Sequence, residues 1–118
     1  MIPLYDELEK ADMIVYASPI YFWHITSQLK AIIDRMYALY MSGRNCAFRG
    51  KDTAAIFVCG GNISCCNKAI SFYKNIIVGR LNCSDKGMLL VSGTTPESFD
   101  LEAQGFLIKA YNMGASIR

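Results

Sequence analysis

The sequence has few of the residues that build metal centres and covalent frameworks. It contains one histidine, and its five cysteines are an odd number with no CxxC spacing. This pattern argues against a zinc site and a disulfide framework, because both need paired ligands or paired thiols. Charge is also sparse, with 19% charged residues and a net charge of +2. The loose basic cluster of Arg44, Arg49 and Lys51 predicts a solvated connection and not a nucleic-acid or membrane surface.

Long hydrophobic runs are absent as well. The longest, residues 13–25, is too short to span a bilayer and is interrupted by Ser18, Pro19 and His24. Residues 1–10 are amphipathic and acidic, unlike a secretory signal. We therefore expect a cytoplasmic protein. The 53% hydrophobic composition supplies core material for a single domain over residues 1–118.

The apolar residues that are present predict alternating strands and helices. Three continuous apolar runs, at residues 13–17, 53–59 and 88–91, are typical of parallel strands buried on both faces. Helical spacing and capping residues predict a helix before the first run and one after each. We expect the first helix to end near Lys10 and the second to run from Thr26 or Ser27 to about Tyr40. The third is expected from Ser64 to Gly79, and the fourth from Thr95 to Gly114. This order predicts a three-layer α/β sandwich with a parallel sheet.

Two segments at predicted strand ends have the composition of a ligand site. Pro19 is followed by four successive rings at residues 21–24, where a surface loop would normally be polar. The glycine pair at residues 60–61 follows the second strand. These glycines predict either a backbone that approaches a planar ligand closely or a positive φ at the glycines themselves. A plain tight turn is an equal alternative from the residues alone. Ligands of parallel α/β sheets bind at the carboxyl ends of the strands, so we expect both segments at one edge.

These residues carry a resemblance to a known family. SPIYF followed by TSQLKAIIDR, at residues 18–35, closely resembles the second flavin loop and following helix of the NADPH-dependent FMN reductase family, a flavodoxin-like group that includes the iron–sulfur flavoproteins. ADMIVYA, RGKDTAAIFVCGG and DKGMLLVSG resemble the family's third, fourth and fifth strands. The resemblance implies a truncated flavodoxin-like sheet that contains strands equivalent to 3, 4 and 5.

The family pattern also assigns roles to individual residues. It implies an FMN cofactor and NAD(P)H as reductant, with no catalytic side chain and no metal, because the cluster cysteines of the iron–sulfur members lie upstream of this region. His24 is then a packing or specificity residue, with an acid role at the reduced flavin as the alternative. The cofactor-binding residues implied by the resemblance are Ser18, Pro19, Ile20, Tyr21 and Phe22 around the ribityl chain and ring edge, Trp23 on the ring, and Gly60, Gly61 and Asn62 at the far edge.

The family's phosphate-binding loop has no counterpart in the sequence. That Ser/Gly-rich loop and its flanking strands belong before Met1, so we expect FMN binding to be weak or absent without it. Three alternatives remain open: a flavin reductase or part of one, a flavin-less remnant or subunit that requires a separate amino-terminal half, and an interaction module that uses the aromatic loop. A homodimer through the exposed edge of strand 13–17 or through the loop is the expected assembly. Cys65 and Cys66 are expected to pack beneath the loop, with a reactive thiol as the less favoured role.

Overall fold

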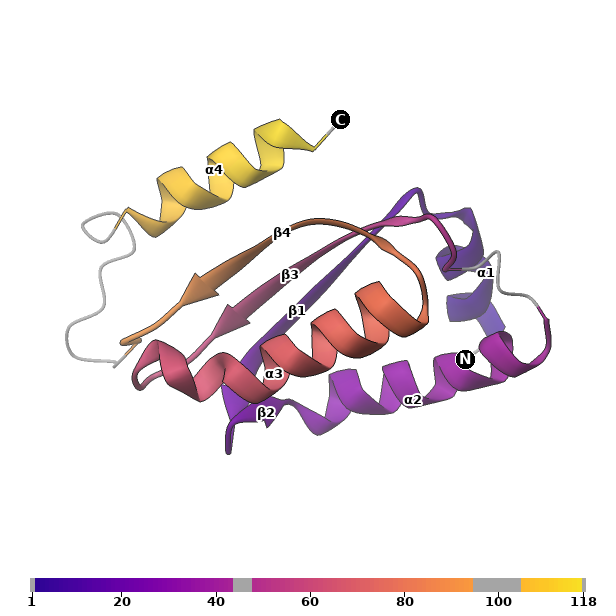
Figure 1. The fold of residues 1–118 in the computed structure, drawn as a ribbon, viewed down its shortest axis with the longest axis horizontal. Coiled ribbons are helices and arrows are strands. Elements are labelled where there is room, and N and C mark those ends of the chain that lie inside the picture. The colour runs from indigo at the N-terminus through magenta and orange to yellow at the C-terminus, as the bar shows by residue number, and fades with distance from the viewer. Residues whose placement is uncertain (1, 44–47, 95–104, 118) are drawn as a thin grey trace.

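The computed structural model describes residues 2–43, 48–94 and 105–117, and these form alternating strands and helices (Figure 1). The predicted helices before the first strand and after residue 26 are confirmed. The elements in chain order are α1 (Ile2–Lys10), β1 (Met13–Tyr21), β2 (His24–Ile25), α2 (Ser27–Met41), β3 (Asp52–Val58), η2 (Ile63–Cys66), α3 (Asn67–Phe72), η3 (Tyr73–Arg80), β4 (Ser84–Val91) and α4 (Phe106–Ser116).

The three predicted strands lie side by side and parallel. The order of the sheet is β2-β1-β3-β4, and only the short β2 runs antiparallel to its neighbour. The register between β1 and β3 is continuous, from Met13 opposite Asp52 to Pro19 opposite Val58. All three long strands therefore end at the same edge of the sheet, which is where the predicted ligand segments follow them.

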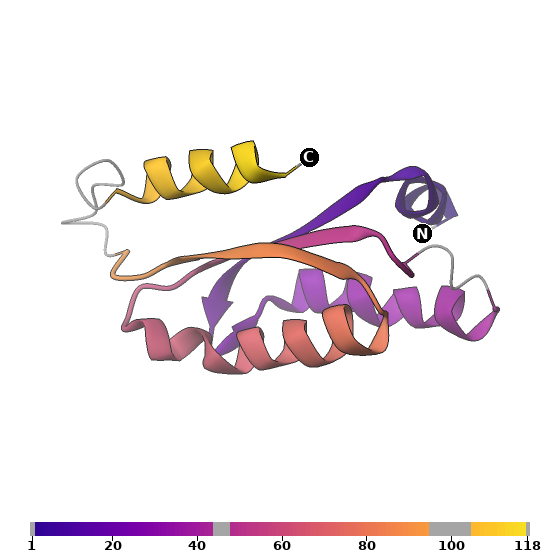
Figure 2. The ribbon, with the colours of Figure 1, turned by 45° about the horizontal axis from the view of Figure 1, so that its top comes forward.

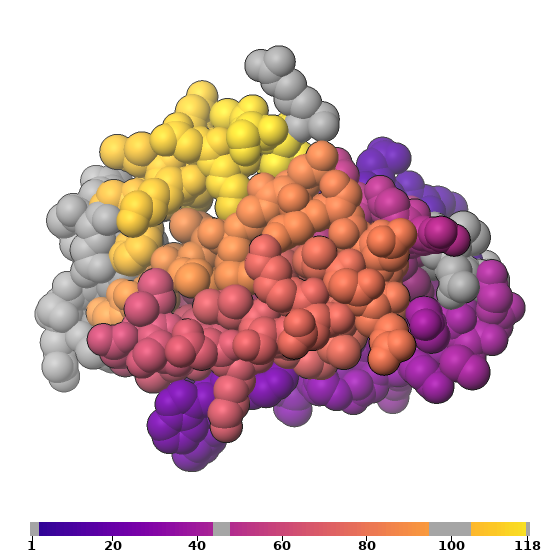
Figure 3. Space-filling model, viewed as in Figure 1, coloured from indigo at the N-terminus to yellow at the C-terminus, as the bar shows by residue number. Residues whose placement is uncertain are grey.

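Helices cover both faces of the sheet, which confirms the three-layer prediction. Figure 2 shows α2 and the α3–η3 segment on one side and α4 on the other. In Figure 3, α4 lies along β4, and Met113 of α4 lies over Gly87 of that strand. The main core lies between the sheet and the α2 and α3–η3 helices, and its largest fully buried side chains are those of Tyr73, Phe48, Phe57, Met36 and Ile77.

The prediction that the first strand is buried on both faces is wrong. Tyr16, Ser18 and Ile20 point toward the helices and are buried, but Val15 is 50% exposed and Ala17 is exposed on the opposite face. The reason is that α4 packs on β4, two strands away, so the described residues place no helix over β1. A continuous apolar run shows that both faces are apolar, but it does not show that both are covered.

The outer edge of β1 is largely open. Among the described residues, β2 pairs with it only at Ile20 and Tyr21. The carbonyl of Asp12 accepts a hydrogen bond from the amide of Asp52 at 3.3 Å, so residues 12, 14, 16 and 18 direct their backbone groups toward β3. Because alternate residues of a parallel strand bond to opposite neighbours, Met13, Val15 and Ala17 direct their N–H and C=O groups outward.

Two helix predictions need correction. Asn62, and not Ser64, caps the segment after β3, and that segment is a 3₁₀ turn, an α-helix and a π-helix in succession. The last helix continues through Gly114 to Ser116, because packing on β4 outweighs the weak helix preference of one glycine. The predicted start at Thr95 lies outside the described residues.

Candidate functional site

The aromatic segment forms a tight hairpin where an open loop was expected. β1 runs on to Tyr21, which pairs with His24 across a two-residue turn, and Ile20 pairs with Ile25. The strand extends because its aromatic and branched residues favour extended backbone. The turn residues, Phe22 and Trp23, thus lie at the carboxyl edge of the sheet.

The backbone of this turn is strained. The φ angles of Phe22 and Trp23 are 48° and 64°, the left-handed values that a two-residue hairpin of type I′ requires at both positions. Asparagine and glycine normally occupy such positions, since the Cβ of other residues costs about 1–2 kcal/mol there. Phe22 is also 92% exposed, so its side chain gains little from packing. Strain of this kind persists where a site needs a particular presentation of its side chains.

A short hydrogen-bond network fixes the hairpin to α2. The Ser18 hydroxyl accepts from the amide of Thr26 at 3.0 Å and donates to the carbonyl of Pro19 at 2.7 Å. Thr26 Oγ1 in turn accepts from the amide of Leu29 at 3.4 Å and caps α2. The side chain of Ser18 is buried in this network, and its backbone groups are directed toward β3.

His24 faces the helices. Its Nδ1 accepts from the amide of Ile25 at 2.9 Å, and its ring lies edge-on to the ring of Phe72 at 5.4 Å. These contacts match the predicted packing role and occupy one ring nitrogen.

The second predicted segment begins where β3 ends. Neither Gly60 nor Gly61 has a positive φ, so that explanation of the glycine pair is wrong. A Cβ on Gly61 would come 3.2 Å from the Sγ of Cys65, whereas one on Gly60 would find its nearest neighbour, a carbonyl oxygen, at 3.7 Å. The glycines therefore allow close packing of this turn. The side chain of Asn62 accepts from the amide of Ser64 at 3.0 Å and is used as a helix cap.

The two segments meet around a hollow of about 180 Å³. This hollow, called the edge pocket below, is small compared with complete ligand pockets, which are about 300–1,000 Å³. Of the nine predicted cofactor-binding residues, Ser18, Pro19, Tyr21 and Asn62 do not line it. The lining consists of Ile20, Phe22, Trp23, Cys59, Gly60, Gly61 and Cys65.

The lining is apolar and uncharged, and it includes one residue that the sequence analysis missed. Cys59 is the last residue before the glycine pair, and this strand-end position is the signal that could have identified it. Cys66 lies behind the lining; burial, with a contribution from Cys59, raises the pKa of its thiol to about 12, so it stays protonated. In the described parts of the chain, no group of three side chains could hold a metal ion.

These features fit one part of a flavin. Aromatic faces, small residues and backbone groups suit a planar, uncharged ring. The lining contains no lysine or arginine, and the 3₁₀ turn η2 that follows the glycine pair has only 4 residues. The edge pocket therefore does not fit a phosphate group.

Comparisons with known proteins give a consistent result. Residues 1–77 match the family model described as NADPH-dependent FMN reductase. A segment of 63 residues is 41% identical to the iron–sulfur flavoprotein of Archaeoglobus fulgidus and covers 53% of this chain and 32% of that protein. The chain thus matches about a third of that relative's length. None of the helices that the structure describes is long and apolar enough to cross a membrane.

Two solved structures share the fold. The Trp repressor binding protein from Bacillus subtilis superposes with a TM-score of 0.72 and 21% identity, over 98% of this chain and 67% of that one. The NADPH-quinone reductase from P. pentosaceus has a TM-score of 0.71 and 19% identity, over 99% of this chain and 74% of that one. Both contain additional chain beyond the part that superposes.

Proposed function

The chain belongs to the NADPH-dependent FMN reductase family, and we propose that it forms the ring-binding part of a cytoplasmic FMN-dependent oxidoreductase that uses NAD(P)H. The observation that carries this proposal is the edge pocket, which the Phe22–Trp23 turn and the Gly60–Gly61 turn form together at the carboxyl ends of β1 and β3. An FMN bound there would accept hydride at its ring. The protein would position the ring and exclude water.

Each part of the edge pocket has a role under this proposal. The Trp23 ring supplies a face on which the isoalloxazine stacks, and the strained hairpin holds that ring in place. The glycine turn lets backbone approach the opposite edge of the cofactor. The lining contains no carboxylate, histidine or lysine side chain, so hydride transfer would depend on positioning alone.

The absence of a phosphate site from the lining bears on affinity. Charge-assisted hydrogen bonds to a phosphate contribute about 1.5–3 kcal/mol each. Without them, FMN has little advantage over riboflavin, which carries the same ring. We therefore expect this chain alone to bind both ligands weakly and with similar affinity.

Titration with both flavins tests the proposal. The intrinsic fluorescence of Trp23, the only tryptophan, is expected to fall as either ligand binds, with dissociation constants that agree within about threefold. Submicromolar FMN affinity with strong preference over riboflavin would show that the chain supplies an anion site elsewhere. No quenching by either flavin would favour the flavin-less alternatives.

The open edge of β1 supports a second candidate role, as a subunit. Three outward N–H groups and an exposed apolar face beside them would accept a strand and a helix from a separate amino-terminal half, or a second copy of the chain. Such a half would also add residues beside the edge pocket. Co-expression with a candidate amino-terminal fragment, followed by measurement of bound FMN, distinguishes this role from that of a remnant.

A further inference from the structure

A second hollow, of about 380 Å³, lies at the edge of the sheet where the strands begin. It is called the basic hollow below, and the ends of α2 and η3 and the turn before β3 contribute to it. Because β3 has 7 residues, this edge lies about 20 Å from the edge pocket. The residues that line the basic hollow are Tyr40, Phe48, Arg49, Gly79, Arg80, Leu81 and Asn82.

The structure separates the residues of the basic cluster that the sequence predicted to be a solvated connection. Lys51 donates from Nζ to carbonyls at the end of α1, at 2.8 Å for that of Glu9, and so has a structural role. Arg49 instead lines the basic hollow, where it is joined by Arg80 from a distant part of the sequence. Arg44, the third member of the cluster, lies outside the described residues.

The backbone holds Arg49 on a fixed turn. The amide of Lys51 donates to the carbonyl of Phe48 at 3.0 Å, and Gly50 has the positive φ, 79°, that a type II turn requires at its third residue. The turn is tied to the core by Phe48, which is 1% exposed. It is also tied to the segment after η3, because the Gly50 amide donates to the carbonyl of Asn82 at 2.9 Å. The fold therefore sets where the Arg49 side chain begins.

The charge of the basic hollow is positive. Its lining has two guanidinium groups and no carboxylate, and among the described residues neither Arg49 nor Arg80 forms an ion pair. The ends of α2 and η3 carry partial negative charge on their free carbonyls, but Ser42 donates to two of these in α2 and the Leu81 amide donates to one in η3. Both guanidiniums are exposed to solvent, so a ligand can reach them.

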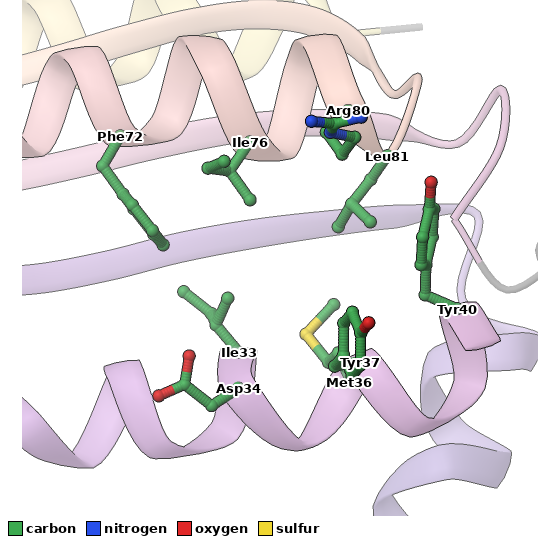
Figure 4. Close-up of a pocket in the computed structure, with 9 residues that line it drawn as sticks. All are labelled: Ile33, Asp34, Met36, Tyr37, Tyr40, Phe72, Ile76, Arg80 and Leu81. Carbon is green, nitrogen blue, oxygen red and sulfur yellow. The ribbon is translucent and has the colours of Figure 1, made fainter.

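Two neutral polar side chains complete the lining. Tyr40, Arg80 and Leu81 also line the neighbouring groove drawn in Figure 4, in which the Tyr40 hydroxyl points from α2 toward η3. The other polar side chain is the amide of Asn82. A hydroxyl and an amide can each donate to and accept from the hydroxyl groups of a ligand.

We propose that the basic hollow binds the phosphate group of a phosphorylated sugar between Arg49 and Arg80. Guanidinium groups form paired hydrogen bonds with phosphate oxygens, and such charge-assisted bonds are about twice as strong as neutral ones. A free phosphate ion would fill only a small part of the hollow, which leaves room for a hydroxylated group beside Tyr40 and Asn82. The site lies at the opposite edge of the sheet from the edge pocket, so it is distinct from the phosphate site of a flavin bound there.

Isothermal titration calorimetry of the full chain tests the ligand class, with ribose monophosphate, inorganic phosphate and ribose as probes. Ribose monophosphate is expected to bind with a dissociation constant below about 1 mM and more tightly than inorganic phosphate, whereas ribose alone should not bind measurably. Equal affinity for inorganic phosphate would overturn the sugar as the ligand. No binding of either phosphate at about 1 mM overturns the site.

Three arginine variants distinguish this site from a general effect of positive charge. Arg49→Gln and Arg80→Gln should each raise the dissociation constant of ribose monophosphate at least about tenfold, because each removes paired charge-assisted hydrogen bonds. Arg35→Gln removes the same charge from an exposed position of α2 outside the lining, and salt screening should keep its effect below about twofold. Far-UV circular dichroism checks that the variants fold. An effect of Arg35→Gln as large as the other two overturns the proposal. Riboflavin affinity should be the same in all three variants, so this result is independent of the flavin titration.

Discussion

At the scale of single residues, the turn that ends β1 is the most unusual feature. Phe22 and Trp23 both have the left-handed backbone that favours glycine and asparagine, and neither side chain is buried in compensation. If the edge pocket binds a flavin ring, stability and binding place opposite demands on position 23. An aromatic side chain would favour flavin binding, whereas glycine would favour stability of the fold.

Two substitutions of Trp23 separate these demands. Trp23→Ala and Trp23→Gly both remove the ring and should weaken flavin binding by about 0.5–1.5 kcal/mol. Only glycine removes the Cβ strain, so Trp23→Gly should be more stable than Trp23→Ala by about 1–2 kcal/mol. Urea denaturation gives the stabilities, and flavin fluorescence gives the affinities. Cys65→Ser, a change in the same lining, should alter binding little; a larger effect there than at Trp23 would favour the thiol role.

A second residue-scale prediction concerns Asp85, which lies at the start of β4. Burial alone would raise the pKa of its carboxyl group, but hydrogen bonds from Lys74, the Gly87 amide and the Tyr73 hydroxyl outweigh burial and lower it. A lowered folded-state pKa means that the ionised group stabilises the fold above the unfolded pKa of about 4 and that this contribution is lost as pH falls through the folded value.

Asp85→Asn should therefore destabilise the protein at pH 7, by about 1–3 kcal/mol for the disrupted, partly buried hydrogen bonds. The difference from wild type should shrink as pH falls below about 4, because the carboxyl of the unfolded state becomes protonated there, and it should vanish once pH has fallen through the lower folded-state pKa. Urea denaturation from pH 3 to pH 7 measures this. Asp6→Asn, an exposed residue of α1 with no ion pair among the described residues, serves as control. A difference that stays constant with pH would contradict the assignment.

At the scale of the element, β1 has one bonded edge and one open edge. Val15 directs its N–H outward and Ile14 directs its own toward β3. Val15→Pro should thus leave the ladder intact and cost little stability. Ile14→Pro removes a ladder bond and should cost about 1–3 kcal/mol in addition to any loss of packing. Urea denaturation of both variants tests the assignment, and equal losses would contradict it.

The same variant distinguishes the two candidate interfaces. A dimer held through the Phe22–Trp23 turn should survive Val15→Pro, whereas one held by pairing of two β1 strands should dissociate, because proline removes an edge donor. Light scattering at micromolar concentration gives the answer.

At the scale of the whole molecule, the layers are unevenly covered. α2 and α3–η3 cover one face of the sheet completely enough to bury a large core, but α4 covers only the β4 side of the other face. The uncovered area, the open edge of β1 and the small edge pocket all lie on or beside the same strand. In the subunit role proposed above, one strand and one helix from a separate polypeptide would cover all three features together.

The sequence by itself determined the order of strands and helices and the two segments that line the edge pocket. It could do so because helical spacing, apolar runs and strand-end glycines are local signals, and parallel strands bring their ends to one edge. Tertiary structure alone decided that Val15 is exposed, that Ser18 is used in a hydrogen-bond network and that Cys59 joins the lining. Each of these depends on which element packs against which, and no local pattern encodes whether an apolar face finds a partner within the chain.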